Sequence, residues 1–268
     1  MRDVTSLRGH LLTLGRVVLG YSGGVDSALL AVVAAGALGK RDFLAVIGRS
    51  TSYPEDAWRA ATDLAVRFGI PLRDIETLEL DDVRYRANPV NRCYFCKSEL
   101  WTRLDRLARD EGFDTVMDGT HADDLADHRP GLAAALERGV RSPLAELGWS
   151  KADVRRAARE LEIPVWDAPA APCLSSRIRY GLEVTPGRLR QVEMAERGLR
   201  ELGFAGDLRV RHLGDTARVE VAPAELAHLE QVWDRVQAAL LGLGFARVER
   251  DPVGYRRGSL LVLEPLAG

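Results

Sequence analysis

Residues 17–30 read Val17-Val-Leu-Gly-Tyr-Ser-Gly-Gly-Val-Asp-Ser-Ala-Leu-Leu30, and this stretch decides the fold. The apolar run before Ser-Gly-Gly and the Ala- and Leu-rich run after it predict a buried strand that turns sharply into a helix. Gly23 and Gly24 let the backbone come close to a ligand, because neither residue has a Cβ atom. Backbone amides at the start of a helix and the helix dipole both favour an anion. The stretch therefore predicts an anion-binding loop at a helix N-terminus.

The side chains of this loop suit a nucleotide phosphate. Ser22 and Ser27 add hydroxyl donors, and Asp26 adds a carboxylate at which a phosphate-bound Mg²⁺ can sit. The loop is neither a mononucleotide P-loop, since no Gly-Lys-Ser/Thr follows, nor the Gly-x-Gly-x-x-Gly dinucleotide motif. Ser22-Gly-Gly-Val-Asp-Ser27 resembles the PP-loop of the ATP pyrophosphatases, which implies that it holds the β,γ-pyrophosphate of ATP while the α-phosphorus is attacked. A plain glycine turn is disfavoured, because all six residues match directly after a strand.

Composition and charge narrow the class of protein. The 268 residues suffice for one large domain or two modest ones, each with its own core. The formal net charge of −2 shows no basic excess, which argues against a protein that grips a long nucleic acid. No uninterrupted apolar stretch reaches ~18 residues, and the first residues show no secretory pattern. We expect a cytoplasmic protein without a membrane or nucleic-acid partner.

Short apolar strands alternate with helical stretches over the first part of the chain. Strands are expected at 16–21, 43–48, 72–80 and 114–120, and helices at 4–15, from the loop to 38, and at 54–68, 97–109 and 150–161, with 81–96 irregular. This spacing is typical of βαβ units and predicts a Rossmann-like parallel sheet in an α/β fold. Ligands of such sheets bind beyond the C-terminal strand ends, so Asp118, Gly119 and Thr120 are expected near the loop.

A proline-rich segment from Pro164 to Pro172 precedes a second part of the chain. We place the boundary near residue 180, which gives a PP-loop domain at 1–180 and a substrate-binding and oligomerisation domain at 181–268. In the second domain, helices are expected at 185–202 and 222–241, and strands at 208–212, 218–221 and 245–249. These elements predict a small α+β domain.

Three cysteines fall in two motif-like stretches. Cys93 and Cys96 form Cys-x-x-Cys, and Cys173 stands in a Pro-Cys-Leu-Ser-Ser-Arg stretch. Three thiolates without an obvious fourth ligand can hold three irons of a [4Fe–4S] cluster and leave the fourth iron open to hydrosulfide. Two alternatives stay open, namely a zinc site completed by His121 or His128, and three small side chains buried in the core.

Taken together, these motifs resemble the LarE family, ATP-dependent sulfur transferases that make the nickel-pincer cofactor of lactate racemase. The resemblance covers nearly the whole chain and rests on Ser22–Ser27, Asp118-Gly119, Asp127-His-Arg-Pro-Gly131, Cys173-Leu-Ser-Ser-Arg177, Arg209-Val-Arg211 and Gly254-Tyr-Arg256. It implies that ATP adenylates a carboxylate of pyridinium-3,5-biscarboxylic acid mononucleotide with release of pyrophosphate. Sulfur then displaces AMP and leaves a thiocarboxylate, and a second round gives the dithio product.

The two branches of the family differ in the source of sulfur. In one branch, a lone cysteine that matches Cys173 gives up its own sulfur and becomes dehydroalanine. In the other branch, an added Cys-x-x-Cys is expected to hold a [4Fe–4S] cluster whose open iron binds sulfide, which permits turnover. Because this chain has Cys93 and Cys96, the resemblance implies the cluster branch, with Cys173 as the third ligand.

The same resemblance implies a role for each residue of the site. Cys173 and Asp26 are expected to be catalytic, with ATP, Mg²⁺ and a [4Fe–4S] cluster as cofactors. The expected ATP-binding residues are Ser22, Gly23, Gly24, Asp26, Ser27 and Gly119. The phosphate or carboxylate of the substrate is expected to contact Arg129, Ser176, Arg177, Arg209, Arg211 and Arg256, unless these arginines lie on a solvated strand edge. The expected partners are the mononucleotide, ATP and sulfide, and identical chains are expected to assemble into a hexameric ring.

Three other functions fit parts of the sequence. A tRNA-thiolating PP-loop enzyme also adenylates its target and uses three cysteines around a [4Fe–4S] cluster, but it needs a basic patch or an RNA-binding domain. An amide-forming ligase of the same superfamily has no use for Cys93 and Cys96. A non-catalytic nucleotide sensor with a zinc staple would bind ATP without releasing pyrophosphate.

Overall fold

The computed structural model describes residues 2–125, 130–169 and 172–256, which divide into two compact units. The first unit comprises Met1–Glu79 and Asn91–Ala171, and the second comprises Leu80–Val90 and Pro172–Gly268. The division differs from the expected ranges 1–180 and 181–268 at two places, because residues 80–90 and 172–180 pack within the second unit. The stretch that contains Cys173 therefore belongs to the second unit.

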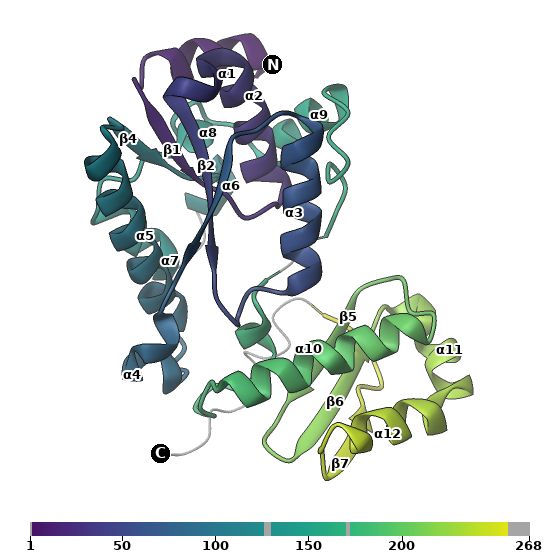
Figure 1. The fold of residues 1–268 in the computed structure, drawn as a ribbon. Helices are drawn as coiled ribbons and strands as arrows, with labels where there is room; N and C mark the ends of the chain where they lie inside the picture. The colour runs from purple at the N-terminus through teal and green to yellow at the C-terminus, as the bar shows by residue number, and fades with distance from the viewer. Residues whose placement is uncertain (1, 126–129, 170–171, 257–268) are drawn as a thin grey trace. The chain divides into compact units, whose positions relative to one another are not determined.

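A four-stranded parallel sheet forms the centre of the first unit (Figure 1). Val17 pairs with Phe43 on one side and with Thr115 on the other. The strands are β1 (Val17–Gly20), β2 (Phe43–Arg49), β3 (Leu72–Glu76) and β4 (Thr115–Met117), in the order β3-β2-β1-β4. The predicted Rossmann-like α/β fold is confirmed.

Helices cover both faces of this sheet. Successive side chains of a strand point to opposite faces, so those of β1 pack in two different cores. Val17 and Leu19 pack in one core with α1 (Val4–Leu12), α2 (Val25–Asp42), α3 (Glu55–Arg67) and α9 (Lys151–Glu160). Val18 packs in a second core with α5 (Arg92–Glu111) and α7 (Pro130–Leu136). Figure 1 shows α5 and α7 on the side of the sheet opposite to α2 and α3. The short helices α6 (Ala122–Leu125) and α8 (Pro143–Glu146) follow β4 in the chain.

The strand order creates a topological switch point between β1 and β4. The chain runs outward from β1 through β2 to β3, and then returns to the other side of β1 to form β4. In open parallel sheets, ligands bind beyond the carboxyl ends of the strands at such a point. The loop of residues 22–27 follows β1, and the segment 118–120 follows β4.

Some element ends differ from the expected ones. α5 begins at Arg92, so the prediction that residues 81–96 are irregular is wrong at its C-terminal end, and Cys93 and Cys96 are helical. Packing of Trp101 and Leu104 against the sheet supports this long helix, although Asn91 provides no side-chain cap. The same segment also holds the helix α4 (Val83–Arg86), and β3 gives way to the 3₁₀ turn η1 (Glu79–Asp81).

A three-stranded sheet organises the second unit. Its strands are β5 (Leu208–His212), β6 (Thr216–Val221) and β7 (Arg247–Arg250), with β5 antiparallel to β6 and β6 parallel to β7. They share a core with α10 (Pro186–Glu201), α11 (Leu226–Gln231) and α12 (Trp233–Gly242), and the unit also contains the 3₁₀ turns η2 (Leu174–Arg177) and η3 (Pro223–Glu225). The expected single helix at 222–241 is broken at Val232, and the predicted small α+β module is present.

Asn88 ties the segment 80–90 into the second unit. Its buried side-chain amide donates to the carbonyl oxygens of Ile178, Arg179 and Leu182 at 3.3, 2.8 and 3.0 Å. These contacts join residues about ninety positions apart in the chain, so no local sequence pattern predicts them.

Among the residues that the structure describes, no helix has the length and apolar character needed to cross a membrane.

Candidate functional site

The loop after β1 is closed by two serines. The Ser27 hydroxyl accepts from the Ser22 amide at 3.2 Å, lies 3.1 Å from the Ser22 hydroxyl, and donates to the Gly24 carbonyl at 3.1 Å. Gly24 is the N-cap of α2, so the amides of the first helical turn have no acceptor within the helix. Ser22 and Gly24 are exposed, whereas Ser27 is buried. The loop therefore presents unpaired helix amides at a positive helix end, which suits an anion.

Two contacts fix the backbone of this loop. Gly23 has a φ of +71°, and a Cβ atom there would lie 2.6 Å from the Cβ of Ala61 on α3. The Tyr53 hydroxyl donates to the Ser22 carbonyl oxygen at 2.9 Å. Burial raises the pKa of Tyr53 to about 12, so this hydroxyl keeps its proton at neutral pH. The loop is thus held in shape by its own scaffold.

The segment after β4 lies directly against the loop. A Cβ atom on Gly119 would lie 2.9 Å from the Ser27 amide nitrogen, so only glycine allows this approach without a shift. Asp118 accepts hydrogen bonds from the Thr120 amide at 3.0 Å and from the Ser142 hydroxyl at 2.8 Å. The switch point therefore brings residues 22–27 and 118–120 together.

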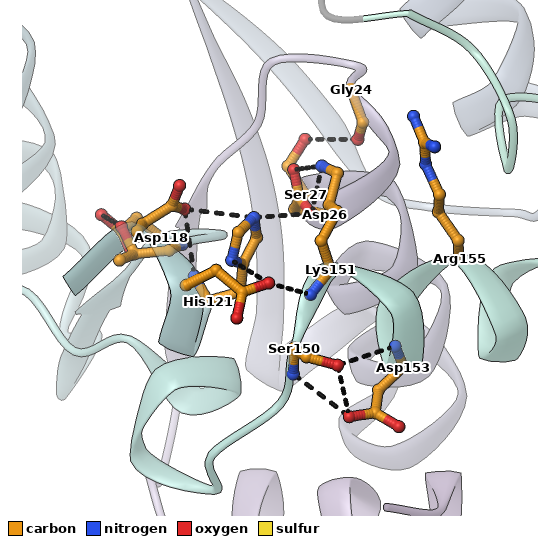
Figure 2. Close-up of polar contacts among 12 residues, drawn as sticks. Gly24, Asp26, Ser27, Asp118, His121, Ser150, Lys151, Asp153 and Arg155 are labelled. Carbon is orange, nitrogen blue, oxygen red and sulfur yellow. Dashed lines mark hydrogen bonds and ion pairs between the residues drawn. The ribbon is translucent and has the colours of Figure 1, made fainter. Parts of the chain in front are cut away.

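Asp26 lies among charged residues from three elements (Figure 2). Lys151 Nζ, at the start of α9, bonds both carboxylate oxygens of Asp26 at 2.7 and 2.6 Å. His121 Nε2 lies 3.8 Å from Asp26 Oδ1 and 3.4 Å from Asp124 Oδ2. The sequence analysis did not identify Lys151 as a residue of the site. The available signal was its rarity, because the chain has three lysines and 34 arginines.

Asp26 fits a magnesium site that a nucleotide completes. Mg²⁺ is commonly held by one or two carboxylates together with substrate phosphates. The Asp26 side chain keeps a quarter of its surface exposed, beside the anion-binding end of α2. In the part of the chain that the structure describes, neither unit groups three or more His, Cys, Asp or Glu side chains as a metal site. The protein would thus supply a single carboxylate here, and phosphate oxygens the remaining ligands.

The cysteines lie at two places. Cys93 and Cys96 occupy the first turns of α5, three residues apart and therefore on one helix face. Cys173 is the N-cap of η2 in the second unit. Cys93 is exposed and the other two are half-buried, so the alternative of three core-filling cysteines is wrong. Accessible thiols at this spacing fit two iron ligands from one helix.

The zinc alternative gains no support from the two histidines. His121 lies beside Asp26 and Asp124, and His128 falls outside the described residues.

Arg177 anchors the turn that carries Cys173. Its Nη1 donates to the carbonyl oxygens of Pro172 and Cys173 at 2.6 and 3.1 Å, and its Nε bonds Glu196 of α10 at 2.9 Å. Ser176 joins this network, because Arg177 Nη1 also donates to the Ser176 hydroxyl at 3.1 Å. Arg177 is only 4% exposed, so its guanidinium acts in a buried setting.

Arg211 of β5 contacts the same turn, and Arg209 of β5 lies near Arg177. Arg211 Nη1 donates to the Ser176 carbonyl at 3.1 Å, and its Nε bonds Glu220 of β6 at 2.9 Å. Arg209 lies over the ring of Tyr255 at 5.0 Å, and burial together with nearby Arg177 lowers its pKa. Both arginines are buried, so the alternative of a solvated strand edge is wrong for them.

The remaining two arginines of the expected site stand differently. Arg256 is exposed and lies 3.3 Å from Asp251 Oδ2, next to Tyr255 in the chain. Arg129 falls outside the described residues. The second unit thus groups Ser176, Arg177, Arg209 and Arg211, and the substrate-binding roles of all six residues stay predictions.

Comparison with known proteins gives the family. The model of the NAD synthase family matches residues 6–90, which contain the loop. A pyridinium-3,5-bisthiocarboxylic acid mononucleotide synthase of Lactiplantibacillus plantarum is 36% identical over 255 residues, which cover 95% of this chain and 92% of that protein. An uncharacterised protein of Synechocystis sp. is 44% identical over 263 residues, 95% of each chain. A cytoplasmic tRNA 2-thiolation protein 1 of Malassezia globosa is 32% identical over 123 residues, which cover 42% of this chain and 33% of that one. Similarity to the Lactiplantibacillus plantarum synthase along nearly the whole chain shows that this protein belongs to the LarE family of PP-loop enzymes.

Proposed function

We propose that the protein is an ATP-dependent sulfur transferase that adenylates a carboxylate of pyridinium-3,5-biscarboxylic acid mononucleotide and converts it to a thiocarboxylate. The supporting observation is that one chain of the LarE family combines a PP-loop at a sheet switch point with Cys173 at the edge of a buried arginine cluster. The tRNA-thiolation alternative has less support, because a relative of that name matches 42% of the chain.

In the first step, ATP activates the substrate carboxylate. A carboxylate oxygen forms a bond to the α-phosphorus, the bond from that phosphorus to the bridging oxygen breaks, and pyrophosphate leaves with the electron pair. The amides of the loop and the hydroxyls of Ser22 and Ser27 would bind the leaving group, and Gly23, Gly24 and Gly119 leave the space for it. The dipole of α2 opposes its charge, and Mg²⁺ on Asp26 would neutralise more of it.

The phosphate of the mononucleotide is proposed to bind to Ser176, Arg177, Arg209 and Arg211. Arg177 and Arg211 are paired with Glu196 and Glu220, so a bound phosphate would share these guanidinium groups with the two carboxylates through charge-assisted hydrogen bonds. Burial and Arg177 lower the pKa of Arg209, and a bound phosphate would raise it again. Arg129 and Arg256 are proposed to complete the contacts to phosphate or carboxylate.

Sulfur is proposed to come from a [4Fe–4S] cluster held by Cys93 and Cys96 of the first unit and Cys173 of the second. When bound, such a cluster supplies an open iron that carries hydrosulfide in a deprotonated, nucleophilic form. Arg177 holds the backbone of Cys173 through the carbonyl contact at 3.1 Å, which would orient that thiolate. Loss of sulfur from Cys173 itself is the second candidate, because Cys173 matches the lone cysteine that gives up its sulfur in the other branch of the family, and its thiol is partly exposed.

The proposed localisation, oligomeric state and partners rest on membership of the LarE family. We propose a cytoplasmic homo-oligomer, a hexameric ring, that uses ATP, the mononucleotide and sulfide. Light scattering coupled to size-exclusion chromatography measures the oligomeric mass, and a monomer would contradict the ring.

Anaerobically purified protein tests the proposal with ATP, the mononucleotide and sulfide. We expect pyrophosphate and AMP in equal amounts, together with a substrate in which sulfur has replaced oxygen by mass. The protein should hold about four irons per chain. Stoichiometric zinc would point to a staple, and a protein mass lower by one hydrogen sulfide would point to sacrifice of Cys173. Absence of pyrophosphate release would refute the proposal and favour a nucleotide sensor.

A further inference from the structure

Tyr85 forms a buried hydrogen bond to the turn that carries Cys173. The Tyr85 hydroxyl lies 2.6 Å from the Ser175 hydroxyl, and the two residues are 1% and 0% exposed. Both belong to the second unit, although they stand 90 positions apart in the chain. The pair therefore joins the segment 80–90 to η2 within one compact unit.

The turn η2 and its N-cap have a buried part and an accessible part. Leu174 and Ser175 are buried. Cys173 and Ser176 are partly exposed, and the Ser176 amide donates to the Cys173 carbonyl oxygen at 3.0 Å. Because the backbone closes on itself in this way, displacement of Ser175 would also move Cys173.

The backbone of the segment that carries Tyr85 is fixed by its neighbour Asn88. Asn88 has a φ of +54°, a left-handed conformation that is uncommon outside glycine. Its side-chain amide bonds the carbonyl oxygens at 178–182, and its own carbonyl oxygen accepts from the Gly181 amide at 3.0 Å. Such conformations persist where the surrounding structure determines them, and they cluster at functional sites. Tyr85 thus presents its hydroxyl to η2 from a fixed backbone.

A polar pair at this place specifies geometry more than it adds stability. Replacement of both partners of a buried hydrogen bond by apolar groups of the same shape is nearly neutral, so stability alone does not require the two hydroxyls. A directional contact between hydroxyls, in contrast, fixes the position of the Ser175 side chain. Arg177 Nη1 bonds the Cys173 carbonyl oxygen at 3.1 Å. The turn is therefore held at Ser175 by Tyr85 and at Cys173 by Arg177.

We propose that Tyr85 is a positioning residue for sulfur transfer, which acts through Ser175 to hold Cys173 where sulfur attacks the activated carboxylate. The proposal rests on the proposed function, because it takes Cys173 as the residue that binds or delivers the sulfur. In the transfer step, a deprotonated sulfur forms a bond to the carboxyl carbon, the bond from that carbon to the phosphate-bearing oxygen breaks, and AMP leaves with the electron pair. When the sulfur is displaced, water attacks the same carbon and returns the carboxylate, so ATP is consumed without product.

Tyr85→Phe in the full chain tests this role, since it removes the hydroxyl and keeps the ring. The measured quantity is the thiocarboxylate formed per pyrophosphate released, at sulfide concentrations low enough for water to compete in the parent. This ratio does not depend on how much of the enzyme is folded. We expect it to fall by about tenfold, because a misplacement of about 1 Å costs about 100-fold in rate. The KM for ATP should stay within about twofold, because the PP-loop lies in the other unit.

Alkylation of the thiols gives a second readout that needs neither iron nor substrate. In the full chain without added iron, iodoacetamide should modify Cys173 about 2- to 10-fold faster in Tyr85→Phe than in the parent, because loss of one hydrogen bond favours opening of the turn by that factor. Cys93 is exposed on α5 and serves as the internal reference in the same mass spectrum. Its rate should stay within about twofold.

Two further variants separate positioning from a general loss of stability. Ser175→Ala removes the same hydrogen bond from its other end, so the double variant should be no worse than either single variant. Thr115→Val is the matched control, because it removes a hydroxyl hydrogen bond of 2.7 Å to the Leu14 carbonyl oxygen at the start of β4. This control should keep the product ratio and the Cys173 alkylation rate of the parent.

Two results would overturn the inference alone. An unchanged product ratio or an unchanged Cys173 alkylation rate in Tyr85→Phe would show that the hydroxyl does not place the thiol. Losses in Tyr85→Phe and Ser175→Ala that multiply in the double variant would show that the two hydroxyls act independently. A parent that forms no thiocarboxylate would refute the proposed function together with the role in transfer, and the alkylation rates would still decide whether Tyr85 holds the turn.

Discussion

Gly23→Ala changes a residue of the PP-loop and should lower the free energy of unfolding for two separate reasons. The φ of +71° is a left-handed conformation that costs a residue with a Cβ atom about 1 kcal/mol. The new Cβ would also lie 2.6 Å from the Cβ of Ala61, and overpacking of this kind costs about 1–3 kcal/mol. We therefore expect the free energy of unfolding to fall by about 2–4 kcal/mol. Binding of an ATP analogue should weaken as well, because relief of the clash displaces the loop.

A second substitution separates the two costs. Ala61→Gly removes the atom that the new Cβ strikes, at a cost of about 1 kcal/mol for a glycine inside α3. The double variant should be less destabilised than the two single variants predict together, by about 1–3 kcal/mol. Urea denaturation of the four proteins measures this coupling. Additivity within about 0.5 kcal/mol would refute the packing of Gly23 against α3.

Three further predictions concern the second unit. Cys173→Ala should abolish sulfur transfer while pyrophosphate release remains measurable, and retained transfer would remove Cys173 from the mechanism. Arg209→Gln should raise the KM for the mononucleotide by about 10- to 100-fold and leave the KM for ATP unchanged, whereas a shared rise in both would contradict a phosphate site in this unit. Burial lowers the pKa of His212 to about 4 from 6.5, so the unfolded chain binds more protons between these pH values and the free energy of unfolding falls as the pH decreases through this window. The loss amounts to about 3 kcal/mol, at about 1.36 kcal/mol per pH unit, and His212→Gln should remove it from urea denaturation curves; an unchanged slope would contradict the buried, neutral state of His212.

Local signals were enough to predict the sheet and its loop. Strands of a parallel sheet are buried on both faces and read as continuous apolar runs, which is why 17–20 and 43–49 stand out in the sequence. Gly23 marks the turn, since its φ of +71° and the Ala61 Cβ at 2.6 Å favour glycine, whereas Gly24 has an ordinary extended backbone. The strand order then brings Gly119 to the loop without any further information.

Features that depend on distant contacts escaped prediction. Lys151 and Asp26 form an ion pair although they are 125 positions apart in the chain, so no sequence pattern near either residue predicts the contact. The division into units was equally hidden, because the side chain of Asn88 bonds backbone groups at 178–182. Burial of Arg209 and Arg211 could not be read from alternating strand residues, since the alternation shows which residues share a face and not what covers it.

Transfer of oxygen from the substrate to AMP tests the central claim most directly. Activation of a carboxylate by ATP joins its oxygen to the α-phosphorus, and sulfur then breaks the bond from that oxygen to carbon. With a mononucleotide whose carboxylates carry oxygen-18, the account predicts one labelled oxygen in each AMP released, measured by mass spectrometry. Unlabelled AMP, or ADP in its place, would contradict it.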